Sequence, residues 1–206
     1  FPVKIFKKID IEARISEIKT KKVKTCVEKN DTNQSKLAMG ATLNDLTEYE
    51  RKYPLTLLSI ILGGGTNSKL FRNVREKNSL CYYIHSTINK LDNLLLIRAG
   101  ISKNNFDEVV KLTKKEISSL KRGNIEDIEL ENAKMMYLSS IDELEESQDD
   151  IIDSYYMMDL IGVDDIETKK KKMSKVTKEE IVKVAKKIHL NTIYLLEGDK
   201  DEENWS

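Results

Sequence analysis

Residues 62–84 read LGGGTNSKLFRNVREKNSLCYYI, and our prediction of the fold starts from this stretch. Its three consecutive glycines indicate the end of a helix over residues 49–62, because a glycine just beyond a helix adopts the left-handed conformation at little cost. A second helix is predicted over residues 68–77, where apolar side chains recur on one side. A strand then begins at Cys81. We therefore expect a helix, a glycine turn, a second helix and a strand in this segment.

The flanking segments predict strands before this stretch and mainly helices after it. Residues 22–27 alternate between apolar and polar side chains, and a polar turn at residues 30–33 separates them from a second short strand. The strand at Cys81 and the next one are joined by a short polar loop that is typical of a hairpin. A capping box at Thr177 opens the last helix. Further strands are expected over residues 36–43, 81–88, 94–101 and 191–197, and further helices over residues 104–122, from 124 onward, 148–160 and 177–188.

This order of elements predicts an α+β fold, with a largely antiparallel sheet and helices packed on one of its faces. The chain has 206 residues, which is long enough to bury a substantial core in one large domain or two small ones. Hydrophobic residues make up 39% of it and charged residues 34%, so the composition is that of a folded chain and not of a disordered one.

Charge and cysteine content exclude several classes of protein. The chain has 35 Lys plus Arg and 35 Asp plus Glu, and a neutral chain is a poor nucleic-acid binder, because phosphate binding requires excess cations. The longest apolar run, residues 55–62, is far shorter than the roughly 20 residues that cross a bilayer, so no membrane partner is expected. Cys26 and Cys81 are too few for a disulfide framework and, without an apolar export signal, favour a cytoplasmic location.

The charges are nevertheless segregated along the chain. Residues 126–153 are strongly acidic, whereas residues 169–178 are basic. This pattern fits two solvated helix faces that offset each other, and it also fits a charged cavity wall or a surface on which a partner docks.

The chain lacks the spacing of residues that a zinc site or a nucleophile pair requires. His85 and His189 are its only histidines, and neither stands in an H-E-x-x-H or H-x-x-E-H pattern, which places two imidazoles on one helix face. No metal site is therefore predicted. Cys81 and His85 lie four residues apart on a strand, which separates their Cα atoms by roughly 13 Å, too far for a hydrogen-bonded pair.

The glycine turn is a weak match to a phosphate-binding loop. Residues 63–69 fail the Walker pattern, because Ser68 stands where that pattern requires a glycine before the lysine, and they follow a helix instead of a strand. A helix end followed by a helix start accounts better for the segment, and an amide-lined turn there can bind a peptide carboxylate. Gly64, Gly65 and Ser68 are therefore the predicted substrate-binding residues.

The stretch as a whole resembles the second-half signature of the insulinase/pitrilysin-type zinc peptidases, the group that includes the mitochondrial processing peptidases. In that family a glycine-rich turn leads into a helix with S-x-L-F…L-R-E and then a strand with L-A-Y. The order of elements fits over most of the chain, and a bacterial branch with N-V-R-E-K-x-S-L-x-Y-Y is the most similar. Cys81 replaces the usual alanine. The matching residues are Ser68, Leu70, Phe71, Val74, Arg75, Glu76, Leu80, Cys81 and Tyr82.

The resemblance implies that this chain is one of two similar halves that enclose a chamber. One half carries H-x-x-E-H and the zinc ion; the other lacks the metal and supplies an Arg–Tyr pair, which by motif position is Arg75 and Tyr82. Residues 31–206 would then be a single α+β half-domain without zinc, preceded by a leading segment or linker and the first strand over residues 1–30. The implied partners are the zinc-bearing half, attached or separate, and peptide substrates, in a homo- or heterodimer.

Other functions remain open. Some relatives have lost activity, so the chain would also fit a catalytically silent scaffold, and a third hypothesis is a module that binds peptides at a sheet edge. Taken singly, Arg75 fits a surface ion pair with a residue such as Asp92, and Tyr82 fits a half-buried strand aromatic. Only the combined motif assigns the pair to substrate.

Overall fold

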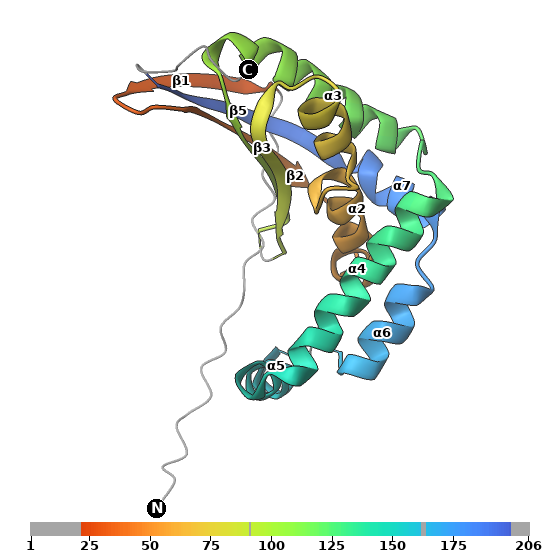
Figure 1. Ribbon diagram of the computed structural model, residues 1–206. Coiled ribbons are helices and arrows are strands. Elements are labelled where there is room, and N and C mark those ends of the chain that lie inside the picture. The colour runs from red at the N-terminus through yellow and green to blue at the C-terminus, as the bar shows by residue number, and fades with distance from the viewer. Residues whose placement is uncertain (1–21, 91, 162–163, 199–206) are drawn as a thin grey trace, which may run out of the picture.

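The computed structural model describes residues 22–90, 92–161 and 164–198, among which five strands form one sheet (Figure 1). The strands are β1 (Lys24–Asn30), β2 (Ser35–Leu43), β3 (Cys81–Asn89), β4 (Leu94–Ile101) and β5 (Ile188–Gly198). They lie in the order β1-β5-β2-β4-β3. β1 runs parallel to β5, and all other neighbours are antiparallel.

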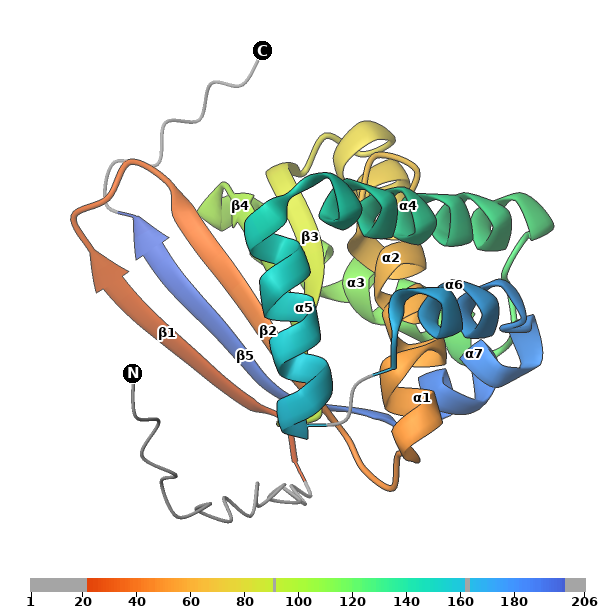
Figure 2. The ribbon, with the colours of Figure 1, turned by 90° about the horizontal axis from the view of Figure 1, so that it is seen from below.

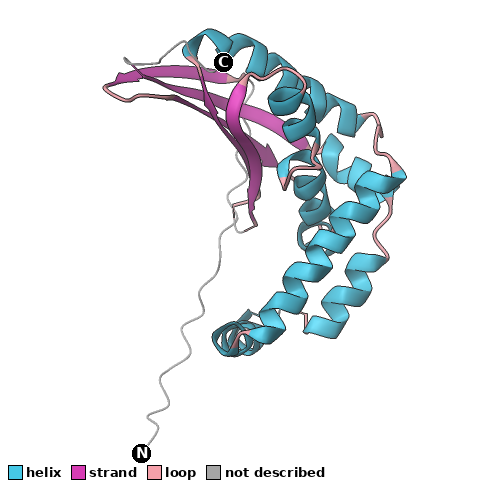
Figure 3. Ribbon diagram, in the orientation of Figure 1, coloured by secondary structure: helices cyan, strands magenta, loops and turns pink. Residues whose placement is uncertain are grey.

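The helices cover one face of this sheet and extend beyond it (Figures 1 and 3). They are α1 (Glu48–Lys52), α2 (Pro54–Gly63), the π-helix η1 (Phe71–Glu76), the short 3-10 helix η2 (Lys103–Asn105), α3 (Phe106–Lys121), α4 (Asp127–Glu146), α5 (Gln148–Ile161), α6 (Ile166–Ser174) and α7 (Lys178–Lys186). α4 leads away from the sheet to α5, which lies across from the open face of the sheet (Figure 2). The predicted α+β fold, with a largely antiparallel sheet and helices on one face, is confirmed.

α2 is the central helix of the core. Its apolar side chains are buried on nearly every side, because it contacts β3 on one side and α4 and α7 on others. The strands supply the facing layer: Leu37 and Met39 of β2 and Leu95 and Ile97 of β4 point toward the helices, alternating with residues of the open face.

Several helices differ from the predicted ones. The helix expected over residues 49–62 is divided, because Pro54 has no amide hydrogen to continue α1 and instead begins α2. α6 was not predicted, since its lysine-rich sequence offers few apolar positions from which to read a helical period. The helix that starts with the capping box at Thr177 ends at Lys186, and β5 already begins at Ile188.

β5 enters the sheet between two strands that are consecutive in the sequence. The predicted polar turn at residues 30–33 does join β1 to β2, but each of them pairs with β5. All seven residues of β1 are exposed, so this edge strand lies outside the helical layer. The boundary predicted at residue 30 stays a prediction; β1 and β2 belong to one sheet.

α2 approaches the backbone of the sheet closely at Gly63. A Cβ atom added there would lie 2.6 Å from the backbone nitrogen of Ser86 in β3. The Ser86 hydroxyl donates to the carbonyl of Ser59 at 2.8 Å and so ties the strand to the helix. The end of α2 and the middle of β3 are therefore held at a distance that only glycine allows.

Glu50 ties α1 to α7 through a buried carboxylate. It accepts a hydrogen bond from the amide of Thr47 at 2.8 Å and binds Lys187 at 2.8 Å and Lys183 at 3.0 Å. Burial alone would raise the pKa of Glu50, but the hydrogen bonds from Lys187, from the Thr47 amide and from Lys183 outweigh it and lower the pKa to about 2.

We expect Gly63→Ala to lower the free energy of unfolding by about 1–3 kcal/mol, because the added methyl group must push backbone atoms of β3 away. Gly65→Ala is the matched control: its nearest neighbour would be the flexible Met136 side chain at 3.5 Å, so the expected change is below about 0.5 kcal/mol. Urea unfolding measures both values. Equal effects of the two substitutions would contradict the close approach.

We expect Glu50 to make stability depend on pH in the acid range. Because its pKa is lowered from 4.5 to about 2, its contribution is complete above about pH 4.5 and is lost as the pH falls toward 2. A shift of this size corresponds to at most about 3–4 kcal/mol. The difference in unfolding free energy between the wild type and Glu50→Gln should therefore shrink between pH 5 and pH 3, whereas Glu108→Gln, at an exposed ion pair with Lys111, should show little difference at either pH. A difference for Glu50→Gln that does not change with pH would contradict this.

Candidate functional site

The turn between α2 and β3 begins with the predicted glycine stop. The amide of Gly64 donates to the carbonyl of Ile60 at 2.9 Å and closes α2. Ser68 then fixes the start of the next helical segment, because its hydroxyl donates to the carbonyl of Gly65 at 2.6 Å and accepts from the amide of Phe71 at 3.4 Å. The hydroxyl of Ser68 is thus engaged within the turn itself.

η1 is a π-helix, whereas the sequence predicts an ordinary helix over residues 68–77. The amide of Lys77 donates to the carbonyl of Arg72 at 2.9 Å, five residues back. The segment leaves this turn through Ser79, which has a φ of 51°, and the amide of Leu80 returns to the carbonyl of Val74 at 3.2 Å. Single π-turns of this kind are frequent at functional sites, because they re-aim the side chains that follow.

Arg75 and Tyr82 line one cleft at the end of η1. The guanidinium carbon of Arg75 lies 4.6 Å from the centre of the Phe71 ring, and the Tyr82 side chain is 60% exposed. The cleft has a volume of about 270 Å³. Its other lining residues come from β3, from β4 and from the segments that flank β2, β3 and α3: Gln34, Ser79, Leu80, Cys81, Gly100, Ile101, Ser102 and Asn105.

A β-bulge presents Tyr82 to this cleft. Cys81 pairs with Ile101 of β4, while Tyr83 pairs with Gly100, so Tyr82 is the extra residue. The ring of Tyr83 lies against Gly100 and stacks on His85, with the ring centres 5.8 Å apart. Since the buried Ile84 and Ser86 of β3 face the helices, Tyr83 packs on the open face of the sheet.

Cys81 is one of the residues that line the cleft. Burial raises the pKa of its thiol to about 11, and the nearby positive charge of Arg75 partly offsets that rise. Asn105 secures the adjacent backbone, because its side-chain amide donates to the carbonyl of Leu80 at 3.1 Å. The thiol is therefore protonated at neutral pH and forms a small, weakly polar part of the cleft wall.

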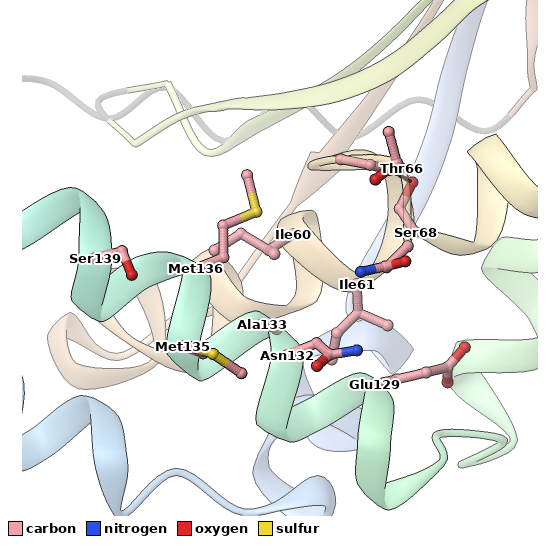
Figure 4. Close-up of a pocket in the computed structure, with 12 residues that line it drawn as sticks. Ile60, Ile61, Thr66, Ser68, Glu129, Asn132, Ala133, Met135, Met136 and Ser139 are labelled. Atoms are coloured by element: carbon pink, nitrogen blue, oxygen red, sulfur yellow. Dashed lines mark hydrogen bonds between the residues drawn. The ribbon is translucent and has the colours of Figure 1, made fainter.

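The predicted substrate-binding residues of the glycine turn face a different cavity. Gly65 and Ser68 line a space of about 360 Å³ between the turn and α4, and Gly64 is not among its lining residues. Figure 4 shows Met136 of α4 beside Ile60 of α2. The two cavities share no lining residue, so the structure does not bring the glycine turn together with Arg75 and Tyr82.

A buried ion cluster behind η1 was not predicted from the sequence. Glu129 of α4 binds Lys69 at 2.9 Å with one carboxylate oxygen and Arg72 with the other. The side chains of Lys69 and Glu129 are only 9% and 4% exposed. The one local signal was the spacing from Glu126 to Glu129, which forms the capping box of α4.

No metal centre can be assembled from the residues that the structure describes. No group of three or more histidine, cysteine, aspartate or glutamate side chains among them lies close enough to bind an ion, so these residues do not fit a zinc site. Among the residues that the structure describes, no helix is both long enough and apolar enough to cross a bilayer.

Comparison with known proteins relates the fold and the motif to peptidases. Residues 5–137 match the protein-family model described as the peptidase M16 inactive domain. Over 177 residues the chain is 31% identical to a Bacillus subtilis protein named probable inactive metalloprotease YmfF. This alignment covers 85% of this chain and 41% of YmfF. The chain therefore spans about two fifths of the length of this relative.

Solved structures share the fold. A conserved protein from Enterococcus faecalis V583 matches with a TM-score of 0.84 and 27% identity, over 91% of this chain and 44% of that chain. A protease from Helicobacter pylori matches with a TM-score of 0.74 and 20% identity, over 85% of this chain and 44% of that chain. In both, the match spans less than half of the other chain.

We expect Cys81 to react slowly with iodoacetamide. With a pKa of about 11, only about one thiol in a thousand is ionised at pH 8, so in a Cys26→Ser background the rate should rise about tenfold per pH unit up to pH 10. Arg75→Ala should slow the reaction further, because it removes the charge that stabilises the thiolate. The exposed Cys26, measured in a Cys81→Ser background, should react faster at pH 8. A rate for Cys81 that levels off near pH 9 would contradict the buried thiol.

Proposed function

The chain belongs to the peptidase M16 family, among its inactive domains, and we propose that it is the zinc-free half of a two-half metallopeptidase. In this proposal a companion half, attached or separate, supplies the zinc ion and the general base. The present chain closes a chamber around a peptide and contributes Arg75 and Tyr82 to its cleavage. The length comparison supports the companion half, because less than half of YmfF is matched.

The observation that carries the proposal is the cleft shared by Arg75 and Tyr82. A bulge and a π-turn, two irregular features of the backbone, border the same small space. Arg75 and Tyr82 are exposed beside this space, whereas Val74 of the same π-turn is buried in the core. Irregular backbone that aims polar side chains outward favours a role in binding over a role in stability.

The chemistry of the two side chains suits a peptide carbonyl under attack. Negative charge develops on the carbonyl oxygen as a peptide bond is hydrolysed, and a phenol O–H and a guanidinium directed at that oxygen stabilise the transition state more than the ground state. Tyr82 would donate a hydrogen bond, and Arg75, held over the Phe71 ring, would supply a fixed positive charge. Companion-bound zinc would activate the attacking water.

We keep the glycine turn in the proposal as a second contact with the peptide. The hydroxyl of Ser68 and the amide of Gly64 are already engaged, so the backbone of Gly65, which lines the cavity beside the turn, would make this contact. The location proposed from the sequence is the cytoplasm. Cys26 and Cys81, on which that location rests, are free thiols in the structure.

A silent scaffold is the second candidate function, and the comparison with YmfF favours it. That relative is named a probable inactive metalloprotease, so a chain of this type can occur in a protein without activity. A scaffold would keep the companion half bound while Arg75 and Tyr82 contribute nothing to turnover. The sheet edge offers a third candidate: β3 lies at the end of the strand order, so a peptide could pair with its outer side.

We expect peptide cleavage only when this chain is combined with its zinc-bearing half, as the full-length protein or as a reconstituted complex. In that assembly Arg75→Ala and Tyr82→Phe should each lower kcat/KM by about 10²–10³, the typical cost of losing one donor at a developing oxyanion. Gel filtration checks that the assembly is intact. Arg122→Ala, at an exposed position after α3, is the matched control and should have no effect.

The alternatives give different results in the same assay. Unchanged turnover in both variants, with an intact assembly, would contradict the proposal and support the scaffold. Peptide affinity of the isolated chain without zinc, measured by fluorescence anisotropy, would support the sheet-edge module. Cleavage by the isolated chain would contradict all three.

A further inference from the structure

We infer that Glu129 is a positioning residue for Arg75: its buried carboxylate holds η1 in the π-helical conformation that directs the Arg75 guanidinium into the cleft. The inference rests on the proposed function, because it takes Arg75 to be the group that acts on substrate. It adds a residue that neither contacts the cleft nor belongs to the sequence motif.

Both carboxylate oxygens of Glu129 have partners. Lys69 binds one carboxylate oxygen at 2.9 Å, and the amide of Glu126 donates to an oxygen at 3.0 Å. The side-chain guanidinium of Arg72 binds the other oxygen. The carboxylate of Glu129 is only 4% exposed, and burying its charge costs free energy unless partners replace the hydrogen bonds that it made to water. The side chains of Glu129, Lys69 and Arg72 are therefore held together.

Glu129 binds the same π-turn that contains Arg75, through Arg72. Arg72 contributes its side chain to Glu129 and its carbonyl to the π-turn, where it accepts from the amide of Lys77 at 2.9 Å. Arg75 lies inside this turn. The ring of Phe71, on which Arg75 stacks, belongs to the residue next to Arg72. Any shift of Arg72 therefore moves both the backbone that carries Arg75 and the ring that supports its guanidinium.

The position of Lys69 strengthens this constraint. Lys69 precedes η1, whereas Arg72 lies within it, so Glu129 binds the segment at two points separated by one turn. The buried side chains of Leu70 and Val74 hold this segment against the core, and the two contacts to one carboxylate on α4 add a restraint on the side of η1 that carries Arg72. The rotation of η1 determines whether Arg75 points toward Tyr82 or toward solvent.

The test is a double-mutant cycle in the complete assembly. Glu129→Gln should lower kcat about ten- to a hundredfold with little change in KM, because a misplaced donor loses mainly transition-state stabilisation. In an Arg75→Ala background the same substitution should change kcat less than twofold. Glu131→Gln, at an exposed ion pair on the same helix, is the matched control and should leave kcat unchanged.

Hydrogen exchange supplies a readout that does not depend on activity. The amides of Lys77 and Leu80 donate within the turn, so their exchange should become faster in Glu129→Gln and stay unchanged in Glu131→Gln. Because Glu129→Gln leaves the buried Lys69 without its counter-charge, a variant that fails to fold is replaced by Lys69→Met/Glu129→Gln. Arg72→Lys should retain more activity than Arg72→Met, since it keeps one charged contact.

The outcomes separate the inference from the proposed function. Equal losses from Glu129→Gln with and without Arg75 would show a merely structural cluster and overturn the inference alone. An Arg75→Ala variant with full activity would overturn the proposed function and, with it, the inference. Loss that disappears in the Arg75→Ala background, together with faster exchange of the two amides, would support both.

Discussion

The packing of α2 against β3 is the constraint on which the rest of the structure depends. α2 is apolar on almost all sides, so it can be buried only in the centre of the molecule, between the sheet and the other helices. Gly63 lets its end reach the backbone of β3, and Ser86 locks that contact with a hydrogen bond to Ser59. The chain leaves α2 at this contact and returns as β3 within about twenty residues. The positions of Arg75 and Tyr82 on that connection are therefore set by the core beneath it.

Two buried carboxylates connect the helices in the same way. Glu50 of α1 and Glu129 of α4 are both the third residue of their helix, and both accept a hydrogen bond from the amide at the helix start. Each also binds two cationic side chains from another segment, α7 in one case and the region of η1 in the other. A capping box is a local device, but its glutamate can also serve as a tertiary contact when the helix start is buried. The fold uses this combination once at each end of α2.

Irregular backbone occurs both in the core and at the candidate site. In the core, the pairing of β2 with β5 shifts register between Gly40 and the buried Ala41. At the candidate site, the π-turn of η1 and the bulge at Tyr82 border the same cleft, and they leave Arg75 and Tyr82 exposed while Val74 stays buried in the core. Membership of an inactive-domain family agrees with a chain that has no metal-binding cluster among its described residues and yet keeps this arrangement. In the function that we propose, the chemistry of this site is completed by another half.

The sequence by itself determined the strands, most of the helices, the α+β class and the resemblance carried by residues 62–84, because helix periodicity, caps and glycine stops depend on neighbours a few residues away. Only the tertiary structure decided that β5 lies between β1 and β2, that η1 is a π-helix and that Tyr82 sits in a bulge. It also decided that the glycine turn faces one cavity while Arg75 and Tyr82 face another, and that Glu129 meets Lys69 and Arg72 across nearly sixty residues. These features depend on which distant segments share a buried surface, and that choice is made by the packing of the whole core, which no local pattern records.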